Sequence, residues 1–262
     1  MDISILAKTV KTEELRCNER SCAYVKKSSE HSCDDSALLI VKDDYALIGV
    51  FDGVSGEANA STASETALKT IANYVEKNFG HKNESELLEN SISEANYAIK
   101  VGGTTASIAL ILKNGNYFYA NIGDSHIYKI SNNKINRLTK DDRNTSSFAN
   151  YIKHRMHVTQ CIGGLLSKID AGKGKLESGE VLFAITDGII DNLFVRVEGG
   201  IVTDTSGRQD LERLFYGKKD IKTIIEALTE EIKKRMQLKE ELIDNGILVP
   251  KEDDASIVFF RY

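Results

Sequence analysis

The chain alternates between short apolar runs and longer segments in which apolar residues recur with helical spacing. Two apolar runs, 36–42 and 45–51, are joined by a charged turn, and both are short and compatible with β-structure. They predict a β-hairpin. In 58–79 apolar residues recur every four positions, and 84–100 has a similar apolar side. This spacing is typical of amphipathic helices, so two helices are predicted after the hairpin.

The second half of the chain continues the same alternation. The segments 104–112 and 116–130 are rich in β-branched and aromatic residues and flank a short polar turn, which predicts a second hairpin. Strands are also predicted over 181–186 and 256–262, and apolar spacing predicts a long amphipathic helix over 220–242. Strands interleaved with helices suggest two packed sheets with helices outside, an α+β layered sandwich.

Length, charge and hydropathy narrow the class of protein. The 262 residues contain no internal repeat and no Pro/Ser/Gly-rich linker, so we expect one domain over 1–262. A formal net charge of −5 gives no broad positive field, which argues against nucleic acid as a partner. The apolar stretches are far shorter than a bilayer span, and the first residues lack the layout of a signal peptide. We therefore expect a cytoplasmic protein without a membrane partner.

The four cysteines, Cys17, Cys22, Cys33 and Cys161, are too few and too unevenly spread for a disulfide framework. The first three could in principle bind zinc together with His31. Their spacing contains no Cys-x2-Cys knuckle, however, so unpaired thiols are the preferred interpretation.

Aspartates stand at the ends of the predicted strands. Asp34 and Asp35 precede the first strand, and Asp52 ends its hairpin partner. If the turn is centred between residues 43 and 44, Asp35 faces Asp52 across the ladder. Two or three carboxylates then meet at one end of the sheet.

The same arrangement recurs at Asp124, at Asp187 and at Asp253 with Asp254. An aspartate before glycine is, taken singly, more often a turn residue than a ligand. Several at strand ends form a cluster of like charges whose pKa values rise unless cations neutralise them. All-oxygen ligation favours Mg²⁺ or Mn²⁺, and the cluster therefore suggests two-metal chemistry in which a bridging water attacks a phosphoryl or acyl centre.

The strand ends also carry sequence motifs that resemble a known family. Five segments match in order and spacing from about residue 30 onward: Phe51-Asp52-Gly53-Val54-Ser55-Gly56, Gly102-Gly103-Thr104-Thr105-Ala106, Ala120-Asn121-Ile122-Gly123-Asp124-Ser125, Ala184-Ile185-Thr186-Asp187-Gly188-Ile189 and Asp253-Asp254-Ala255-Ser256-Ile257-Val258. They resemble the signatures of the PPM (protein phosphatase 2C) family of metal-dependent serine/threonine phosphatases, in a bacterial-type variant. The resemblance implies an α-β-β-α sandwich with two central antiparallel sheets and a metal cleft at one end. It also implies hydrolysis of phosphoserine and phosphothreonine in protein substrates by a metal-activated water.

The resemblance assigns the metal ligands and implies two Mn²⁺ or Mg²⁺ ions. Asp52 resembles the carboxylate that bridges both ions, and the carbonyl of Gly53 resembles a ligand of one of them. Asp187 and Asp253 look like ligands of the first metal. Asp124 is similar to the residue that holds a third, weaker ion together with Asp187.

Asp34 falls where the family usually places a glutamate for the second metal, and Asp35 where it keeps an aspartate that orients metal-bound water. Asp35 and Asp52 are thus the predicted catalytic residues. The shorter side chain of Asp34 implies weaker binding of the second ion through water, and Val54 replaces a histidine proposed as general acid in many members. Glu30 stands in place of a phosphate-clamping arginine, so no substrate-binding residue is assigned.

Two other functions remain open at this point. One is a pseudophosphatase that uses the same fold as a binding or scaffolding module, suggested by Asp34 and the missing arginine. The other is a phosphatase of a small phosphorylated metabolite. We expect a monomer, and we expect residues 142–157 to form a flap beside the cleft.

Overall fold

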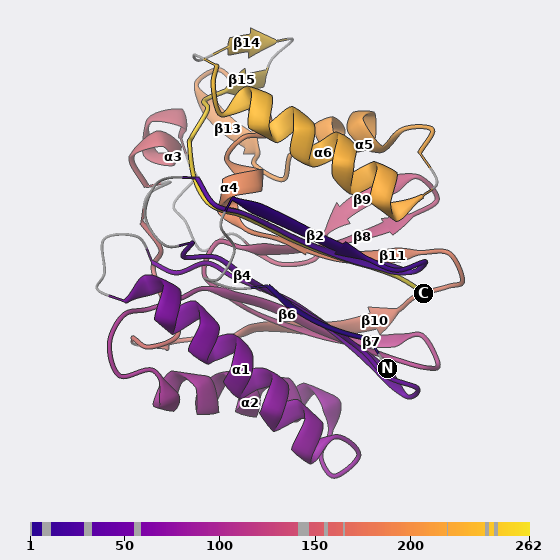
Figure 1. The fold of residues 1–262 in the computed structure, drawn as a ribbon. Helices are drawn as coiled ribbons and strands as arrows, with labels where there is room; N and C mark the ends of the chain where they lie inside the picture. Colours follow the sequence, from indigo (N-terminus) through magenta and orange to yellow (C-terminus); the bar gives the residue numbers. More distant parts are fainter. Residues whose placement is uncertain are drawn as a thin grey trace.

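The computed structural model is a sandwich in which two antiparallel sheets pack face to face and helices cover both outer faces (Figure 1). It describes residues 2–6, 12–28, 33–54, 59–140, 147–154, 157–164, 166–218, 220–238, 241–243 and 246–262. This arrangement is the α-β-β-α sandwich expected from the sequence.

The first sheet is built around the two predicted hairpins. Its strand order is β1 (Asp2–Leu6), β4 (Ser36–Val41), β5 (Tyr45–Phe51), β6 (Ala106–Leu112), β7 (Asn116–Ile122) and β10 (Asp170–Lys175). The helices α1 (Ala60–Asn78) and α2 (Glu84–Ala98) pack against each other and cover its outer face. All seven residues of β5 are buried, because the strand is central and both faces of the sheet are covered.

The second sheet contains the C-terminal strand at its centre. Its order is β2 (Glu13–Cys17), β3 (Ser21–Lys26), β16 (Ala255–Arg261), β11 (Val181–Ile185), β8 (His126–Ser131) and β9 (Lys134–Arg137). Its outer face is covered by α5 (Arg208–Phe215) and α6 (Ile221–Arg235), the upper helices in Figure 1. Under these helices Phe183 stacks between Tyr128 and Phe259, at centroid distances of 5.0 and 4.6 Å.

A small four-stranded sheet lies beside the second layer. It runs β13 (Ile201–Asp204), β12 (Val195–Glu198), β15 (Gly246–Leu248) and β14 (Glu241–Ile243). Two short helices complete the described elements: α3 (Phe148–His154) and α4 (Asp187–Ile190). No helix in these described ranges is long and apolar enough to cross a membrane.

Two predicted elements differ from the observed ones. The segment 116–130 is not one hairpin arm, because the chain leaves β7 at Gly123 and enters the other sheet as β8. Gly123 has a φ of +90°, which favours glycine, and it lies directly against Thr105. The helix predicted over 220–242 ends at Arg235, and 241–243 form strand β14, where a strand partner replaces the helical hydrogen bonds.

The expectation of unpaired thiols is wrong for two of the four cysteines. Cys17 and Cys22 face each other across the β2–β3 hairpin and form a disulfide. Cys33 is buried and its thiol donates to the carbonyl of Asp35, and burial raises the pKa of this thiol. The alternative of a zinc site is therefore wrong for the cysteines, and His31 lies outside the described residues.

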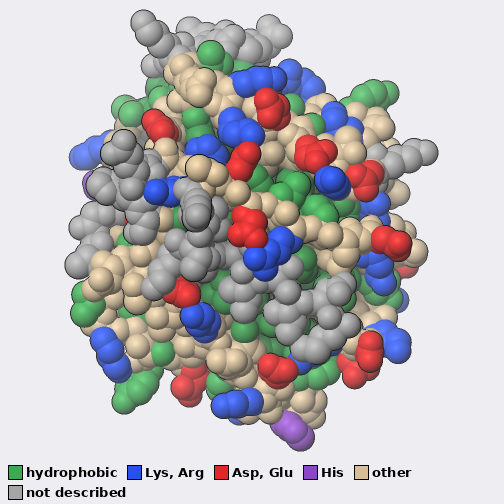
Figure 2. Space-filling view, viewed as in Figure 1, with side chains coloured by type: hydrophobic (Ala, Val, Ile, Leu, Met, Phe, Trp, Pro, Cys, Tyr) green, Lys and Arg blue, Asp and Glu red, His purple; other side chains and the backbone are tan. Residues whose placement is uncertain are grey.

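On the face shown in Figure 2, the coloured acidic and basic side chains are interspersed. This mixture of signs matches the small net charge of the chain.

Candidate active site

The β4–β5 hairpin carries two of the predicted site residues at its open end. Ser36 pairs with Phe51 as the last pair of the ladder, so Asp35 and Asp52 are the next two residues in register. This confirms the register expected from a turn centred between residues 43 and 44. Asp35 is almost fully buried, whereas Asp52 is half-buried.

The backbone of Asp52 is held by the loop that precedes β6. The hydroxyl of Thr104 donates to the carbonyl of Asp52 at 2.9 Å, and the N–H of Thr105 donates to the same oxygen at 2.8 Å. The N–H of Asp52 donates to the Thr105 hydroxyl at 3.1 Å. Gly53 follows in a tight space, because a Cβ there would lie 2.6 Å from the carbonyl oxygen of Ala60. The Gly-Gly-Thr-Thr motif therefore serves to fix the position of Asp52.

The second sheet brings Asp187 and Asp253 to the same end of the sandwich. Asp187 follows β11 as the first residue of α4, and Asp253 lies just before β16, the strand that pairs with β11. Gly188 allows a close approach of the two segments, because a Cβ there would lie 1.8 Å from the carbonyl oxygen of Asp254. A larger residue at position 188 cannot be accommodated without separating them.

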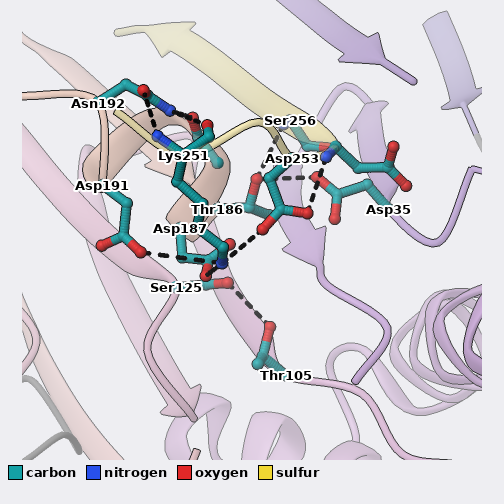
Figure 3. A network of polar contacts seen from close by, with 12 residues as sticks. Asp35, Thr105, Ser125, Thr186, Asp187, Asp191, Asn192, Lys251, Asp253 and Ser256 are labelled. Carbon is teal, nitrogen blue, oxygen red and sulfur yellow. Dashed lines mark hydrogen bonds and ion pairs between the residues drawn. The ribbon is translucent and has the colours of Figure 1, made fainter. Parts of the chain in front are cut away.

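Hydrogen bonds tie the two sheets together at this end. The hydroxyl of Thr186 donates to Oδ2 of Asp35 at 2.8 Å and accepts the N–H of Ser256 at 2.9 Å (Figure 3). The carboxylate of Asp254 accepts the N–H of Asp34 at 2.5 Å and that of Ser28 at 2.7 Å. Asp254 thus anchors the chain that enters the Asp34-Asp35 pair.

The carboxylates at this end of the sandwich raise one another's pKa values. Burial raises the pKa of Asp52, and the charges of Asp187, Asp35, Asp253 and Asp124 raise it further, in that order. Burial and the nearby charge of Asp254 likewise raise the pKa of Asp35, although its hydrogen bonds partly oppose this. For Asp253, burial and the charge of Asp187 raise the pKa to about 7. The structure therefore brings together Asp35, Asp52, Asp124, Asp187 and Asp253.

Sequence reasoning missed a cation that contacts this cluster. Nζ of Lys251 lies 2.6 Å from Oδ2 of Asp187 and 2.5 Å from Oδ2 of Asp253 (Figure 3). It also lies 3.8 Å from Oδ2 of Asp191, a buried residue that the motifs did not single out. These carboxylates outweigh the effect of burial and raise the pKa of Lys251. The only feature of the sequence that could have indicated this contact was the presence of a lysine two positions before Asp253.

The donor set suits a hard divalent cation. Carboxylate oxygens are the preferred ligands of Mg²⁺ and Mn²⁺, and the raised pKa values indicate a shortage of positive charge that such ions would correct. Lys251 partly supplies this charge as a stand-in cation. Within the described part of the chain, no three Asp, Glu, His or Cys side chains are already arranged to hold a metal ion. The clustered aspartates therefore fit a divalent ion in chemistry and charge, and Lys251 lies between two of them, Asp187 and Asp253.

The remaining predicted features are only partly described. Asp34 is half-exposed at the same end of the sandwich, and Val54 donates its N–H to the carbonyl of Gly103. Of the expected flap over 142–157, residues 142–146, 155 and 156 lie outside the described residues. Glu30 lies outside them as well. The described part of the range 142–157 contains α3, where the Tyr151 hydroxyl donates to Asp191 at 3.4 Å.

Known proteins resemble this chain both in sequence and in fold. The serine/threonine phosphatase stp of Listeria welshimeri is 27% identical over 123 residues, which cover 42% of this chain and 49% of that relative. The chain thus spans about half the length of the curated relatives it matches.

Two solved structures share the fold over most of both chains. The serine/threonine phosphatase of S. agalactiae matches with a TM-score of 0.67 at 18% identity, covering 95% of this chain and 100% of that one. The catalytic domain of the phosphatase PstP, in complex with two manganese ions, matches with a TM-score of 0.64 at 17% identity, covering 95% and 99%.

The family model described as "Protein phosphatase 2C" matches residues 25–242, a range that includes the Asp52 and Asp187 motifs. This match extends over well more than half of the sequence. The chain therefore belongs to the protein phosphatase 2C family.

Proposed function

We propose that this protein is a metal-dependent phosphatase that removes phosphate from phosphoserine and phosphothreonine in protein substrates. The proposal rests on the convergence of five carboxylates at one end of the sandwich, in a chain of the protein phosphatase 2C family. A cluster with so much unbalanced negative charge is costly to the metal-free protein, and divalent cations give it a function.

In this proposal the residues at the strand ends hold two Mn²⁺ or Mg²⁺ ions. Asp52 would contribute to both sites, the carbonyl of Gly53 would supply one further oxygen, and Asp187 and Asp253 would complete the first site. When bound, the ions supply an activated water and neutralise charge on the phosphoryl oxygens. That PstP was solved with two manganese ions supports this number.

The other predicted site residues have supporting roles. Asp34 would bind the second ion, and Asp124 with Asp187 would bind a third, weaker one. Asp35 would orient the attacking water, and Thr186 holds the Asp35 carboxylate in place by donating to Oδ2. Because this hydrogen bond fixes the orientation of the Asp35 carboxylate, the geometry suits a positioning role.

We further propose that residues 1–262 act as one catalytic domain, as a monomer in the cytoplasm, with a phosphorylated protein as partner and without nucleic acid or membrane. A second candidate function is a pseudophosphatase that binds partners without catalysis. One observation favours it: Lys251 lies between two carboxylates that the first metal needs. Activity measurements decide between the two.

The test is hydrolysis of p-nitrophenyl phosphate and of a phosphothreonine peptide with Mn²⁺, with Mg²⁺ and with EDTA. We expect turnover of the peptide with a divalent ion and none with the chelator. Asp187→Asn should lower the rate by about 100-fold or more, because it removes a proposed metal ligand.

A matched control is Asp43→Asn, an exposed aspartate in the turn at the opposite end of the β4–β5 hairpin. It should keep the wild-type rate. If neither substrate is hydrolysed at saturating Mn²⁺, this result would contradict the proposed phosphatase activity and favour the pseudophosphatase that binds partners without catalysis. Turnover of p-nitrophenyl phosphate without turnover of the peptide would instead favour a small phosphorylated metabolite.

A further inference from the structure

Lys251 is a cation that contacts two of the proposed metal ligands. Its ammonium group forms ion pairs with Asp187 and Asp253, and Asp191 lies slightly farther away (Figure 3). Only 13% of its side chain is exposed, so the charge is largely removed from water. A lysine buried in this way is stable only because the carboxylates compensate for the lost hydration.

The position of Lys251 is built into the fold. The side chain of Asn192, which is fully buried, binds the backbone of Lys251 on both sides. Its Nδ2 donates to the Lys251 carbonyl at 2.8 Å, and its Oδ1 accepts the Lys251 N–H at 3.1 Å. The same Nδ2 donates to the carbonyl of Gly188 at 2.9 Å. One amide therefore ties the residue after Asp187 to the lysine that contacts Asp187.

A divalent ion on the same carboxylates competes with this ammonium group. Ligand oxygens lie about 2.1 Å from Mg²⁺. An ion on Oδ2 of Asp187, which is 2.6 Å from Nζ, would therefore lie within about 5 Å of the ammonium nitrogen. Because a double and a single positive charge repel at such a distance in a largely desolvated site, the two cannot share these oxygens without loss of affinity.

We propose that Lys251 is a built-in cation of the metal-free protein, which neutralises Asp187 and Asp253 and has to leave them before the first divalent ion binds. The inference rests on the proposed metal-dependent function and adds a regulation of its site. Lys251 stabilises the metal-free state, and by the reciprocity of linked equilibria it weakens metal binding to the same extent.

The test measures Mn²⁺ binding by isothermal titration calorimetry for the wild type and for Lys251→Gln. Removal of the charge should tighten binding of the first ion by about ten-fold or more, within the range usual for coupled sites. In EDTA the variant should melt at a lower temperature than the wild type, and saturating Mn²⁺ should raise its melting temperature by more than that of the wild type.

Two further variants serve as controls. Lys129→Gln removes another lysine of similar exposure, whose Nζ lies 2.7 Å from Glu180 at the opposite end of β11, and should leave Mn²⁺ affinity unchanged. Lys251→Arg keeps the charge and should bind Mn²⁺ about as weakly as the wild type. If Lys251→Gln is too unstable in EDTA for titration, Lys251→Arg and Lys251→Met can be loaded with Mn²⁺ and their affinities compared by competition with a chelator. This measurement makes the same comparison between a charged and an uncharged side chain.

Three results overturn the inference. Equal or weaker Mn²⁺ binding by Lys251→Gln would show that the lysine does not compete, while the phosphatase proposal would stand. Tight binding by Lys251→Arg, equal to that of Lys251→Gln, would show that charge is not the cause. Absence of Mn²⁺ binding by all variants and the wild type would overturn the metal-dependent function together with the inference.

Discussion

Two basic side chains, the buried Arg235 and the largely buried Lys251, each contact carboxylates in this protein, and their surroundings differ. Arg235 is 3% exposed and contacts both oxygens of Asp210. Its remaining donors reach Glu231 at 3.0 Å and the carbonyl of Asn192 at 2.9 Å. Lys251, in contrast, lies near the carboxylates of Asp187, Asp191 and Asp253, and further aspartates of the same cluster surround these.

The pKa values of the carboxylates express this difference. Burial alone would raise the pKa of Asp210, but the hydrogen bonds and charge of Arg235 outweigh it and lower the pKa. The pKa of Asp253 rises to about 7, because burial and Asp187 outweigh Lys251. The Arg235 cluster is thus balanced and structural, whereas the Lys251 cluster lacks positive charge, as expected of a site that receives cations.

The largest expected effect tests the structural role of the Arg235 cluster. Arg235→Ala leaves Asp210 buried without its main partner, so the free energy of unfolding should fall by about 3–5 kcal/mol. Urea denaturation in EDTA measures this loss. Lys233→Ala, which removes a more exposed lysine from the same helix, should cost well under half as much. Similar losses for the two variants would mean that Arg235 is no more than a surface ion pair.

An intermediate effect should appear in the pH dependence of the metal-free protein. The pKa of Asp253 rises from 3.8 to about 7 on folding, so between these values the folded protein binds more protons than the unfolded one. Its contribution to stability is fully present below 3.8 and is lost as the pH rises toward 7. Asp210, whose pKa is lowered, behaves in the opposite way: its contribution is present above 3.8 and lost on acidification.

Urea denaturation in EDTA at pH 5 and pH 8 separates the two clusters. The wild type should lose about 1–2 kcal/mol more than Asp253→Asn over this interval. Asp210→Asn should have a lower free energy of unfolding than the wild type at pH 5 and at pH 8. The size of this deficit should be similar at the two pH values. Parallel pH curves for the wild type and Asp253→Asn would show that the carboxylate cluster is not strained by its own charge.

The smallest effect concerns the outer partner of Arg235. The side chain of Glu231 is 33% exposed, and it can be hydrated when the ion pair is lost. Glu231→Gln should therefore change the free energy of unfolding by no more than about 0.5 kcal/mol. Denaturation under the conditions used for Arg235→Ala measures it. A loss comparable with that of Arg235→Ala would mean that the balance of this cluster depends on all its members.

The sequence predicted the central part of the fold because hydrophobic spacing reports local burial. The hairpin over 36–51 has the expected register, and α1 and α2 lie where the apolar spacing placed them. The edge strands β1 and β2 were not predicted, since each is only five residues long and neither contains a continuous apolar run. The shift of the chain from β7 to β8 was missed because local apolar spacing predicts a strand but not the sheet to which it belongs.

What the sequence by itself determined is the set of aspartates at strand ends and their motifs, because turn residues and short apolar runs are local features. Only the tertiary structure decided which of them meet, since Asp52 and Asp187 come from different sheets. It also revealed the contacts of Lys251 and the disulfide between Cys17 and Cys22. Burial and charge interactions depend on distances across the folded chain, and no periodicity along the sequence encodes them.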